Sequence, residues 1–174
     1  QTIYRNRTKR VIVKIYMIYS EELIMSFTTP KSIKPKDWQL RGNPQNLLGH
    51  SIFVIEEGPA NAPVILLLHG FPTSSWDWNL IWESLKKDYR LIALDMLGFG
   101  FSDKPNRRDY SIHQQADIVE ALVKKNQLKE FHVLAHDYGD TVAQELLSRQ
   151  IEKDGAGYWL SCCFLNGGLF PETH

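Results

Sequence analysis

The feature that most constrains this chain is a set of short apolar runs separated by segments of helical spacing. Continuous apolar runs are typical of strands buried on both faces, because neither face then needs polar residues. The runs are VILLL (64–68), RLIALD (90–95), FHVLAHD (131–137) and YWLSCCFLNGG (158–168), and HSIFVIEEG (50–58) predicts an earlier strand. The segments 73–89, 110–128 and 141–151 place apolar residues at helical spacing. This alternation predicts parallel strands joined by right-handed crossovers, and therefore a doubly wound α/β fold with a mostly parallel sheet.

Capping residues predict where these helices begin. Thr73 to Ser75 are candidate N-caps of the first helix. Ser111 and Gln114 fit a capping box at the start of the second, and the residues expected on its inward face are Ile118, Val119, Leu122 and Val123. The polar, proline-bearing stretch from Lys31 to Pro44 predicts an extended lead-in without a helix.

Charge and cysteine content exclude several classes of partner. Twenty Lys and Arg residues balance twenty Asp and Glu residues, so no global field favours nucleic acid or an anionic membrane surface. The stretch GFGFS lacks the Lys-Ser/Thr of a phosphate-binding loop. The only cysteines, Cys162 and Cys163, are adjacent, so on a strand they face opposite ways and predict a reduced core pair. No His/Cys spacing typical of a metal site is present, and we expect neither a metal nor a cofactor.

The amino-terminal part is expected to differ from the rest. Residues 1–48 are predicted to form a poorly defined extension, and residues 49–174 to belong to one domain. A basic cluster precedes an apolar run there, but Lys14, Glu21 and Glu22 interrupt the run below the ~20 apolar residues of a membrane span. Met25 is a candidate true start, with residues 1–24 as extraneous sequence. Amino-terminal sequencing of the mature protein tests that hypothesis.

Polar residues and glycines follow the predicted strands at their carboxyl ends. His69, Gly70 and Phe71 follow one strand, and Asp95, Asp137 and Asn166 end or follow the next three. In a parallel sheet these ends meet at one edge, which is where such folds place their ligands. The sequence therefore predicts one site built from loops that are far apart in the chain.

The stretch Ala135-His136-Asp137-Tyr138-Gly139 fits a nucleophile elbow, a sharp turn between a strand and a helix. Such a turn needs small residues on both sides of its apex, and Ala135 and Gly139 supply them. A carboxylate at the apex is already ionised at neutral pH, attacks carbon and forms an ester, which an activated water then hydrolyses. The alternative is that Asp137 only caps the helix that follows, because Asp is a favoured N-cap.

The stretch His69-Gly70-Phe71-Pro72 places a glycine and a free backbone N–H beside the predicted elbow. The N–H groups of Phe71 and Tyr138 would form a two-donor oxyanion hole. This pairing favours the nucleophile interpretation of Asp137 over the cap.

Four stretches together resemble the α/β-hydrolase superfamily, in the branch of epoxide hydrolases and haloalkane dehalogenases: LLLHGFPTSSWDW, LIALDMLGFGFSDKP, LAHDYGDTVAQELL and LNGGLFPETH. The resemblance covers about residues 49–174, the amino-terminal half of such a domain. It implies that Asp137 is the nucleophile and that Phe71 and Tyr138 are the oxyanion donors. It also implies a cap domain inserted after the strand near Asn166, and a catalytic histidine and final strands farther downstream. A chain without that histidine is expected to be inactive by itself.

The resemblance assigns supporting roles to further residues. Asp95, with Gly98 and Gly100, would shape the loop beside the site, and we interpret these glycines as turn residues with positive φ. His69 and His136 flank the site and are interpreted as buried structural histidines. Pro72, Trp76 and Asn166 complete the predicted binding residues, and Phe71, Trp76 and Trp78 fit an apolar pocket.

The sequence departs from the family's dehalogenases in one position. These enzymes carry tryptophan after the nucleophile, where this chain has Tyr138, which weakens the case for a halide substrate. We therefore expect a small apolar epoxide, ester or related electrophile as substrate. A non-catalytic hydrolase-like binding protein or truncated isoform is the alternative, and the resemblance suggests association with an endoplasmic reticulum membrane.

Overall fold

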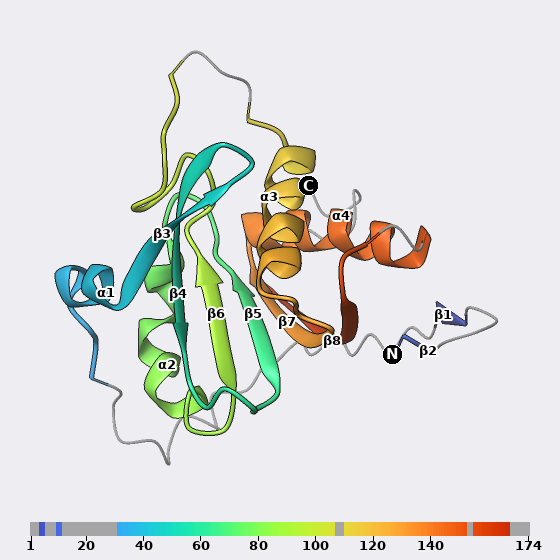
Figure 1. Ribbon diagram of the computed structural model, residues 1–174, viewed down its shortest axis with the longest axis horizontal. Coiled ribbons are helices and arrows are strands. Elements are labelled where there is room, and N and C mark those ends of the chain that lie inside the picture. Colours follow the sequence, from blue (N-terminus) through green and yellow to red (C-terminus); the bar gives the residue numbers. More distant parts are fainter. Residues whose placement is uncertain (1–3, 6–9, 12–30, 107–109, 153–154, 168–174) are drawn as a thin grey trace.

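A computed structural model of the chain describes residues 4–5, 10–11, 31–106, 110–152 and 155–167 (Figure 1). At its centre is a six-stranded sheet in the order β3-β4-β6-β5-β7-β8. Its strands are β3 (Gly42–Leu47), β4 (His50–Glu57), β5 (Val64–Leu68), β6 (Arg90–Leu94), β7 (Glu130–His136) and β8 (Tyr158–Leu165). Two further strands, β1 (Tyr4–Arg5) and β2 (Arg10–Val11), pair with each other.

The sheet is parallel where the site is predicted and antiparallel at one edge. Strand β5 runs parallel to β6 and β7, and β7 runs parallel to β8. Strands β3 and β4 form an antiparallel hairpin, and β4 joins the sheet antiparallel to β6. This arrangement confirms the predicted mostly parallel α/β fold. Because β5, β6, β7 and β8 run in the same direction, their carboxyl ends lie along the same end of the sheet.

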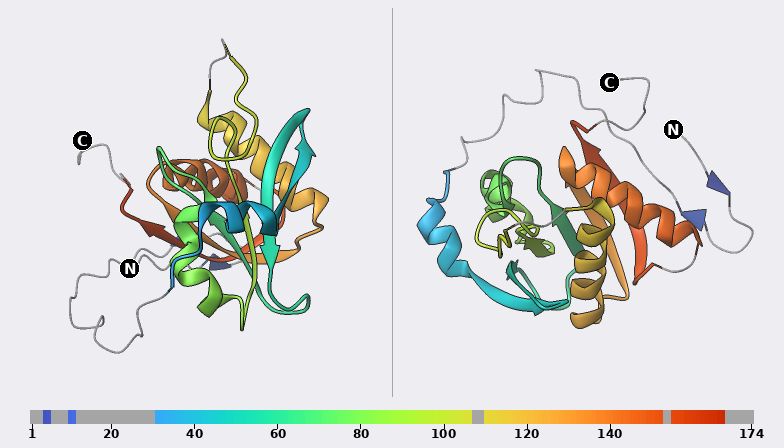
Figure 2. Two further views of the ribbon diagram at one scale, coloured as in Figure 1. Left: turned by 90° about the vertical axis from the view of Figure 1, so that its left-hand side faces the viewer. Right: turned by 90° about the horizontal axis from the view of Figure 1, so that it is seen from above.

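Helices cover both faces of the sheet, as Figures 1 and 2 show. They are α1 (Pro35–Arg41), the 3₁₀ turn η2 (Ser75–Trp78), α2 (Asn79–Leu85), α3 (Ile112–Lys125) and α4 (Tyr138–Glu152). Successive residues of β5 point to opposite faces: Leu66 and Leu68 belong to the core under α3 and α4, and Leu67 to the core under α1 and α2. The apolar run 64–68 is therefore buried on both sides, as predicted.

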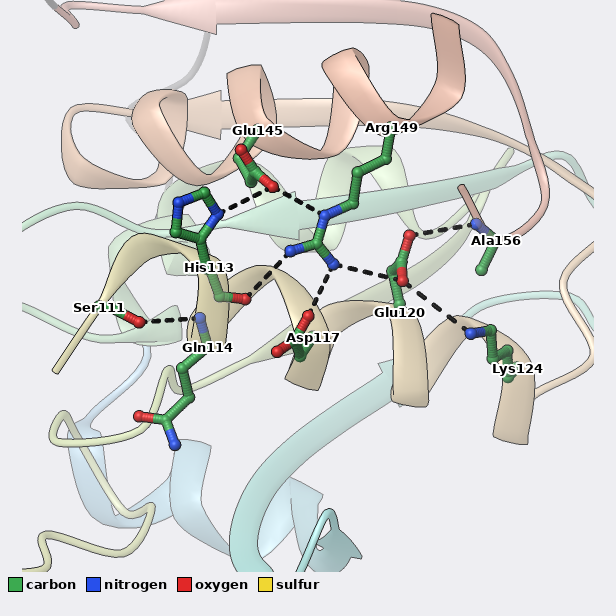
Figure 3. A network of polar contacts seen from close by, with 9 residues as sticks. All are labelled: Ser111, His113, Gln114, Asp117, Glu120, Lys124, Glu145, Arg149 and Ala156. Carbon is green, nitrogen blue, oxygen red and sulfur yellow. Dashed lines mark hydrogen bonds and ion pairs between the residues drawn. The ribbon is translucent and has the colours of Figure 1, made fainter. Parts of the chain in front are cut away.

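Helix α3 follows its predicted pattern. The hydroxyl of Ser111 caps it by accepting a hydrogen bond from Gln114 N–H at 3.1 Å, and all four predicted inward residues are buried. A polar network then joins α3 to α4 (Figure 3). Its centre is the guanidinium of Arg149, which contacts Asp117 at 2.7 Å, Glu120 at 3.4 Å and Glu145 at 2.8 Å. These two helices are thus tied together on the solvent side as well as through the core.

The predicted extended lead-in over residues 31–44 is wrong, because it contains α1 and the start of β3. Pro35 stands at the start of α1, where its missing N–H costs nothing. Trp38 is fully buried, packs edge-on against Trp82 at 4.9 Å and donates its indole N–H to Ser75. The boundary predicted after residue 48 consequently falls inside the β3–β4 hairpin. Met25 and the apolar run from residue 12 onward lie outside the described residues, as do residues 168–174.

Candidate active site

Asp137 lies between the end of β7 and the start of α4, at the predicted apex. Its backbone has a φ of +52°, in the left-handed region that few residues other than glycine, asparagine and aspartate adopt. Two backbone hydrogen bonds hold this conformation: Asp137 N–H donates to Leu165 O at 3.0 Å, and Asp140 N–H donates to Asp137 O at 2.9 Å. The sharp turn is thus supported by β8 on one side and by the first turn of α4 on the other.

The carboxylate of Asp137 faces the loop after β5. Its Oδ1 accepts a hydrogen bond at 2.7 Å from the backbone N–H of Phe71, which is 66 residues away in the chain. An N-cap aspartate would instead accept from the first turn of its own helix, with backbone angles in the β region. The contact with Phe71 fits the nucleophile interpretation better than the cap.

Gly70 allows this approach because it has no side chain. A Cβ atom at this position would lie 2.8 Å from Asp137 Cβ and 2.8 Å from His136 Nδ1. Both distances are shorter than real contacts of a Cβ. The next two residues, Phe71 and Pro72, are exposed at the mouth of the site. A larger residue at position 70 would therefore push the Phe71 N–H away from the carboxylate.

His69 supports the loop and is unsuited to proton transfer. It is fully buried, and its Nδ1–H donates to Gly70 O at 2.8 Å while its Nε2 accepts from Met96 N–H at 2.9 Å. Burial lowers the pKa of this histidine, so the ring stays neutral in the tautomer that these two bonds require. The structural role interpreted for His69 agrees with this geometry.

Asp95 organises the loop after β6. Its Oδ1 accepts from Ser75 N–H and its Oδ2 from Phe101 N–H, both at 2.7 Å. As interpreted from the sequence, Gly98 and Gly100 adopt positive φ angles of 95° and 47°. Asp95 is therefore a buried anchor for two loops beside the site.

An aromatic surface surrounds the elbow, and its central residue, Phe99, was missed by the sequence analysis. The ring of Phe99 packs against His69 at 5.4 Å, Phe71 at 6.1 Å and Tyr138 at 5.8 Å. Its place between Gly98 and Gly100, in the loop that follows a buried strand, was the available signal. Phe71 exposes 67% of its surface, so this aromatic surface is open to an apolar ligand.

Other predicted binding residues support the fold or lie at the same end of the sheet as Asp137. The indole N–H of Trp76 donates to Ile33 O at 2.7 Å, which ties the lead-in to η2. His136 packs edge-on against Trp78 at 6.4 Å. Asn166 directly follows β8 with a φ of 56° and has an exposed side chain. Trp76 is thus a support of the fold, whereas Trp78 and His136 line the same end of the sheet as Asp137.

Tyr138 has its hydroxyl engaged away from the loop of Phe71. Burial raises the pKa of this phenol, and its hydrogen bond with the Gln115 side chain on α3 opposes the rise. Gln115 is itself fixed by two hydrogen bonds with the backbone of Leu97, at 3.1 and 2.8 Å. The residue after Asp137 is therefore held by α3, an arrangement that the sequence pattern did not indicate.

Asp140 is a second carboxyl group at the elbow that the sequence analysis did not single out. It is fully buried, its Oδ1 accepts from Leu165 N–H at 3.4 Å, and its Oδ2 has no hydrogen-bond partner among the described residues. Burial raises the pKa of Asp140 to about 7; the hydrogen bond from Leu165 opposes this rise and the charge of Asp137 adds to it. Near neutral pH, protonated and ionised forms of Asp140 therefore coexist.

Within the described ranges, no group of three or more His, Cys, Asp or Glu residues is arranged to hold a metal ion. The helices of the same ranges are too short or too polar to cross a membrane.

Comparisons with known proteins place this geometry in a family context. A family model described as alpha/beta hydrolase fold matches residues 63–154. The mesoderm-specific transcript homolog protein of Bos taurus is 48% identical over 153 residues, which cover 83% of this chain and 46% of that protein. A haloalkane dehalogenase of Bradyrhizobium diazoefficiens is 33% identical over 117 residues, covering 67% of this chain and 37% of that enzyme. The chain thus spans less than half the length of these relatives.

Solved structures of similar folds agree with the family model. An alpha/beta hydrolase fold protein from Burkholderia ambifaria superposes with a TM-score of 0.64 and 31% identity, covering 74% of this chain and 45% of that one. A structure of novel epoxide hydrolases from metagenomes of hot environments gives a TM-score of 0.65 and 26% identity, covering 72% of this chain and 42% of that one.

Proposed function

The chain belongs to the α/β-hydrolase family, and from this premise we propose that it uses Asp137 as a nucleophile on a small apolar epoxide or ester. The observation that carries the proposal is the contact between Asp137 Oδ1 and the Phe71 N–H at 2.7 Å. It joins the two parts predicted for the reaction, a carboxylate on a strained turn and a backbone donor from another loop.

In the proposed first step the two carboxylate oxygens of Asp137 have different roles. Phe71 holds Oδ1, so Oδ2 attacks the electrophilic carbon of an epoxide and forms an ester bond; with an ester substrate, attack on the carbonyl expels the alkoxide and forms an anhydride instead. For an epoxide, the C–O bond of the ring breaks, its electron pair goes to the ring oxygen, and that oxygen takes a proton from solvent. Oδ1 then becomes the carbonyl oxygen of the ester and already lies in front of a backbone donor.

The proposed second step uses the same donor. Water adds to the ester carbonyl, and negative charge develops on Oδ1, where the Phe71 N–H stabilises it. The bond from this carbon to the alkyl oxygen then breaks, the alkyl oxygen takes a proton, and the diol leaves while the Asp137 carboxylate is restored. This step needs a base that activates water, which the resemblance assigns to a histidine. Both ring nitrogens of His69 are occupied by the backbone bonds at Gly70 and Met96, so His69 is not that base.

The surroundings of Asp137 support an apolar epoxide or ester over an alkyl halide. Phe71 and Phe99 offer aromatic surface beside the carboxylate. A leaving halide needs hydrogen-bond donors, but the Tyr138 hydroxyl is engaged with Gln115. The aromatic contacts therefore favour an apolar substrate, and the engaged Tyr138 hydroxyl disfavours an alkyl halide.

The experiment is covalent trapping on Asp137. The purified chain is incubated with phenyl glycidyl ether, an apolar epoxide, and the adduct is detected by intact mass and located by peptide mapping. We expect one adduct on Asp137 in the wild-type chain and none in Asp137→Asn. Asparagine tolerates positive φ, so this variant should keep the turn. Asp88→Asn, which alters an exposed aspartate, serves as the control and should label like the wild type.

The same experiment distinguishes the enzyme from a binding protein. An adduct that forms equally in Asp137→Asn, or none in a folded wild-type chain, would favour the non-catalytic alternative. Turnover is measured separately, as release of the diol, because ester formation and ester hydrolysis depend on different groups.

A further inference from the structure

The carboxyl group of Asp140 is packed into the junction between α4 and the end of β8. Its side chain is fully buried, and Oδ2 lacks a hydrogen-bond partner in the described part of the chain. A buried carboxyl oxygen without a partner is costly, and one so close to a candidate nucleophile calls for a functional explanation.

The end of β8 lies against this group on two sides. Leu165 N–H donates to Asp140 Oδ1, while Leu165 O accepts from the N–H of Asp137. A Cβ atom on Gly167 would lie 2.6 Å from Asp140 Cβ, so the chain just after β8 passes close to this side chain. Asp140 and Asp137 therefore hold the same strand end, one through its side chain and the other through its backbone.

The titratable groups around Asp140 come from three elements. Asp137 belongs to the elbow, and Cys162 and Cys163 lie on β8, where burial first and the charge of Asp140 second raise the pKa of both thiols. His69 directly follows β5, and its backbone oxygen lies against Gly139; its ring is neutral because burial lowers its pKa. Asp137 is thus the group whose charge competes with that of Asp140.

Asp137 has the better-stabilised charge of the two carboxylates. It is partly exposed and accepts a short hydrogen bond from Phe71, whereas Asp140 is fully buried with one long hydrogen bond. The charge of Asp137 adds to the burial that favours the protonated form of Asp140. Loss of that proton places a second negative charge beside the nucleophile.

We propose that Asp140 is a positioning residue for Asp137, which holds the end of β8 against the elbow and, when it ionises, speeds the attack of Asp137 on a neutral electrophile. This inference rests on the nucleophilic role proposed for Asp137. During the attack, negative charge leaves Asp137 for the ring oxygen of the epoxide. A fixed charge on Asp140 raises the energy of the starting carboxylate more than that of the transition state, where the charge has moved away.

The test is the pH dependence of labelling by phenyl glycidyl ether in the full chain. The rate of adduct formation on Asp137 is measured between about pH 5 and about pH 9, a range that brackets the pKa of Asp140. We expect the wild-type rate to rise roughly fivefold across this range. Asp140→Asn, which has the same shape and no charge, should keep the low rate at every pH. Asp88→Asn should follow the wild type.

The outcomes separate this inference from the proposed function. Labelling of Asp137 with the same pH profile in wild type and Asp140→Asn overturns the role of Asp140 and leaves the nucleophile in place. No labelling of Asp137 at any pH overturns both. Circular dichroism establishes that the variant is folded, and a flat wild-type profile would overturn the inference without any variant.

Discussion

Replacing Asp140 with asparagine is expected to stabilise the protein at alkaline pH and to have little effect at acidic pH. The side chain is fully buried between α4 and β8, so its ionised form must lose solvent without gaining a cation among the described residues. Asparagine has nearly the same shape, can still accept from Leu165 N–H through its carbonyl oxygen, and never ionises.

The magnitude follows from the two states of this carboxyl group. In the folded chain its pKa is raised to about 7, whereas an aspartate in an unfolded chain has a pKa near ~3.9. Between these two pKa values the folded state keeps a proton that the unfolded state has lost. The free energy of unfolding therefore falls by up to ~1.4 kcal/mol for each unit by which the pH rises. The contribution of protonated Asp140 is fully present below about pH 4 and lost above about pH 7. Between pH ~5 and pH ~8 the wild type should therefore lose about 3 kcal/mol relative to the variant, a large share of a typical ~5–15 kcal/mol.

The assay is urea unfolding followed by tryptophan fluorescence, at pH ~5 and pH ~8, for the wild type, Asp140→Asn and Asp88→Asn. At each pH we take the free energy of unfolding of Asp140→Asn minus that of the wild type. This difference should be about 3 kcal/mol larger at pH ~8 than at pH ~5. Asp88→Asn should track the wild type at both. A difference between Asp140→Asn and wild type that is the same at both pH values would refute the reasoning, because Asp140 would then carry no raised pKa.

Two further substitutions test the surroundings of the site. Gly70→Ala would place a methyl group 2.8 Å from Asp137 Cβ and displace the Phe71 N–H, so labelling of Asp137 by phenyl glycidyl ether should fall at least about tenfold; unchanged labelling would mean that this loop does not orient the carboxylate. Arg149→Met should lower the free energy of unfolding by about 2 kcal/mol, because it leaves Asp117, Glu120 and Glu145 without their shared cation. Lys124→Met is its matched control: Lys124 pairs only with Glu120 among the described residues, at 3.9 Å and with 66% of its side chain exposed, and the expected change in urea unfolding is below ~0.5 kcal/mol.

Much of the fold could be predicted because its signals are local. The run 64–68 is apolar at every position and becomes a strand with both faces covered. The inward face of α3 follows directly from the spacing of its apolar residues. The small residues around Asp137 indicated the turn, because the crowding that they relieve lies within a few residues of the chain.

The prediction failed where a distant partner decides the local structure. The stretch 31–44 is polar and contains prolines, yet the burial of Trp38 against Trp82 and Ser75 stabilises α1 there. Burial of one aromatic side chain stabilises the fold by a few kcal/mol, which outweighs the small differences in helix propensity between the residues of such a segment. Phe99 was missed for a related reason, because its aromatic neighbours come from distant parts of the chain, the loop after β5 and the start of α4.

From residue 50 onward the sequence by itself determined the order of strands and helices, and it determined the position of the elbow and the identity of the residue at its apex. Those features depend on periodicity and on steric limits of a few consecutive residues. Only the tertiary structure decided that Phe71 donates to Asp137 across 66 residues, and that Asp140 is buried beside it with a pKa raised to about 7. A contact between distant loops and the energy of a buried charge depend on which surfaces meet and how much water they exclude, and no local pattern of residues records either quantity.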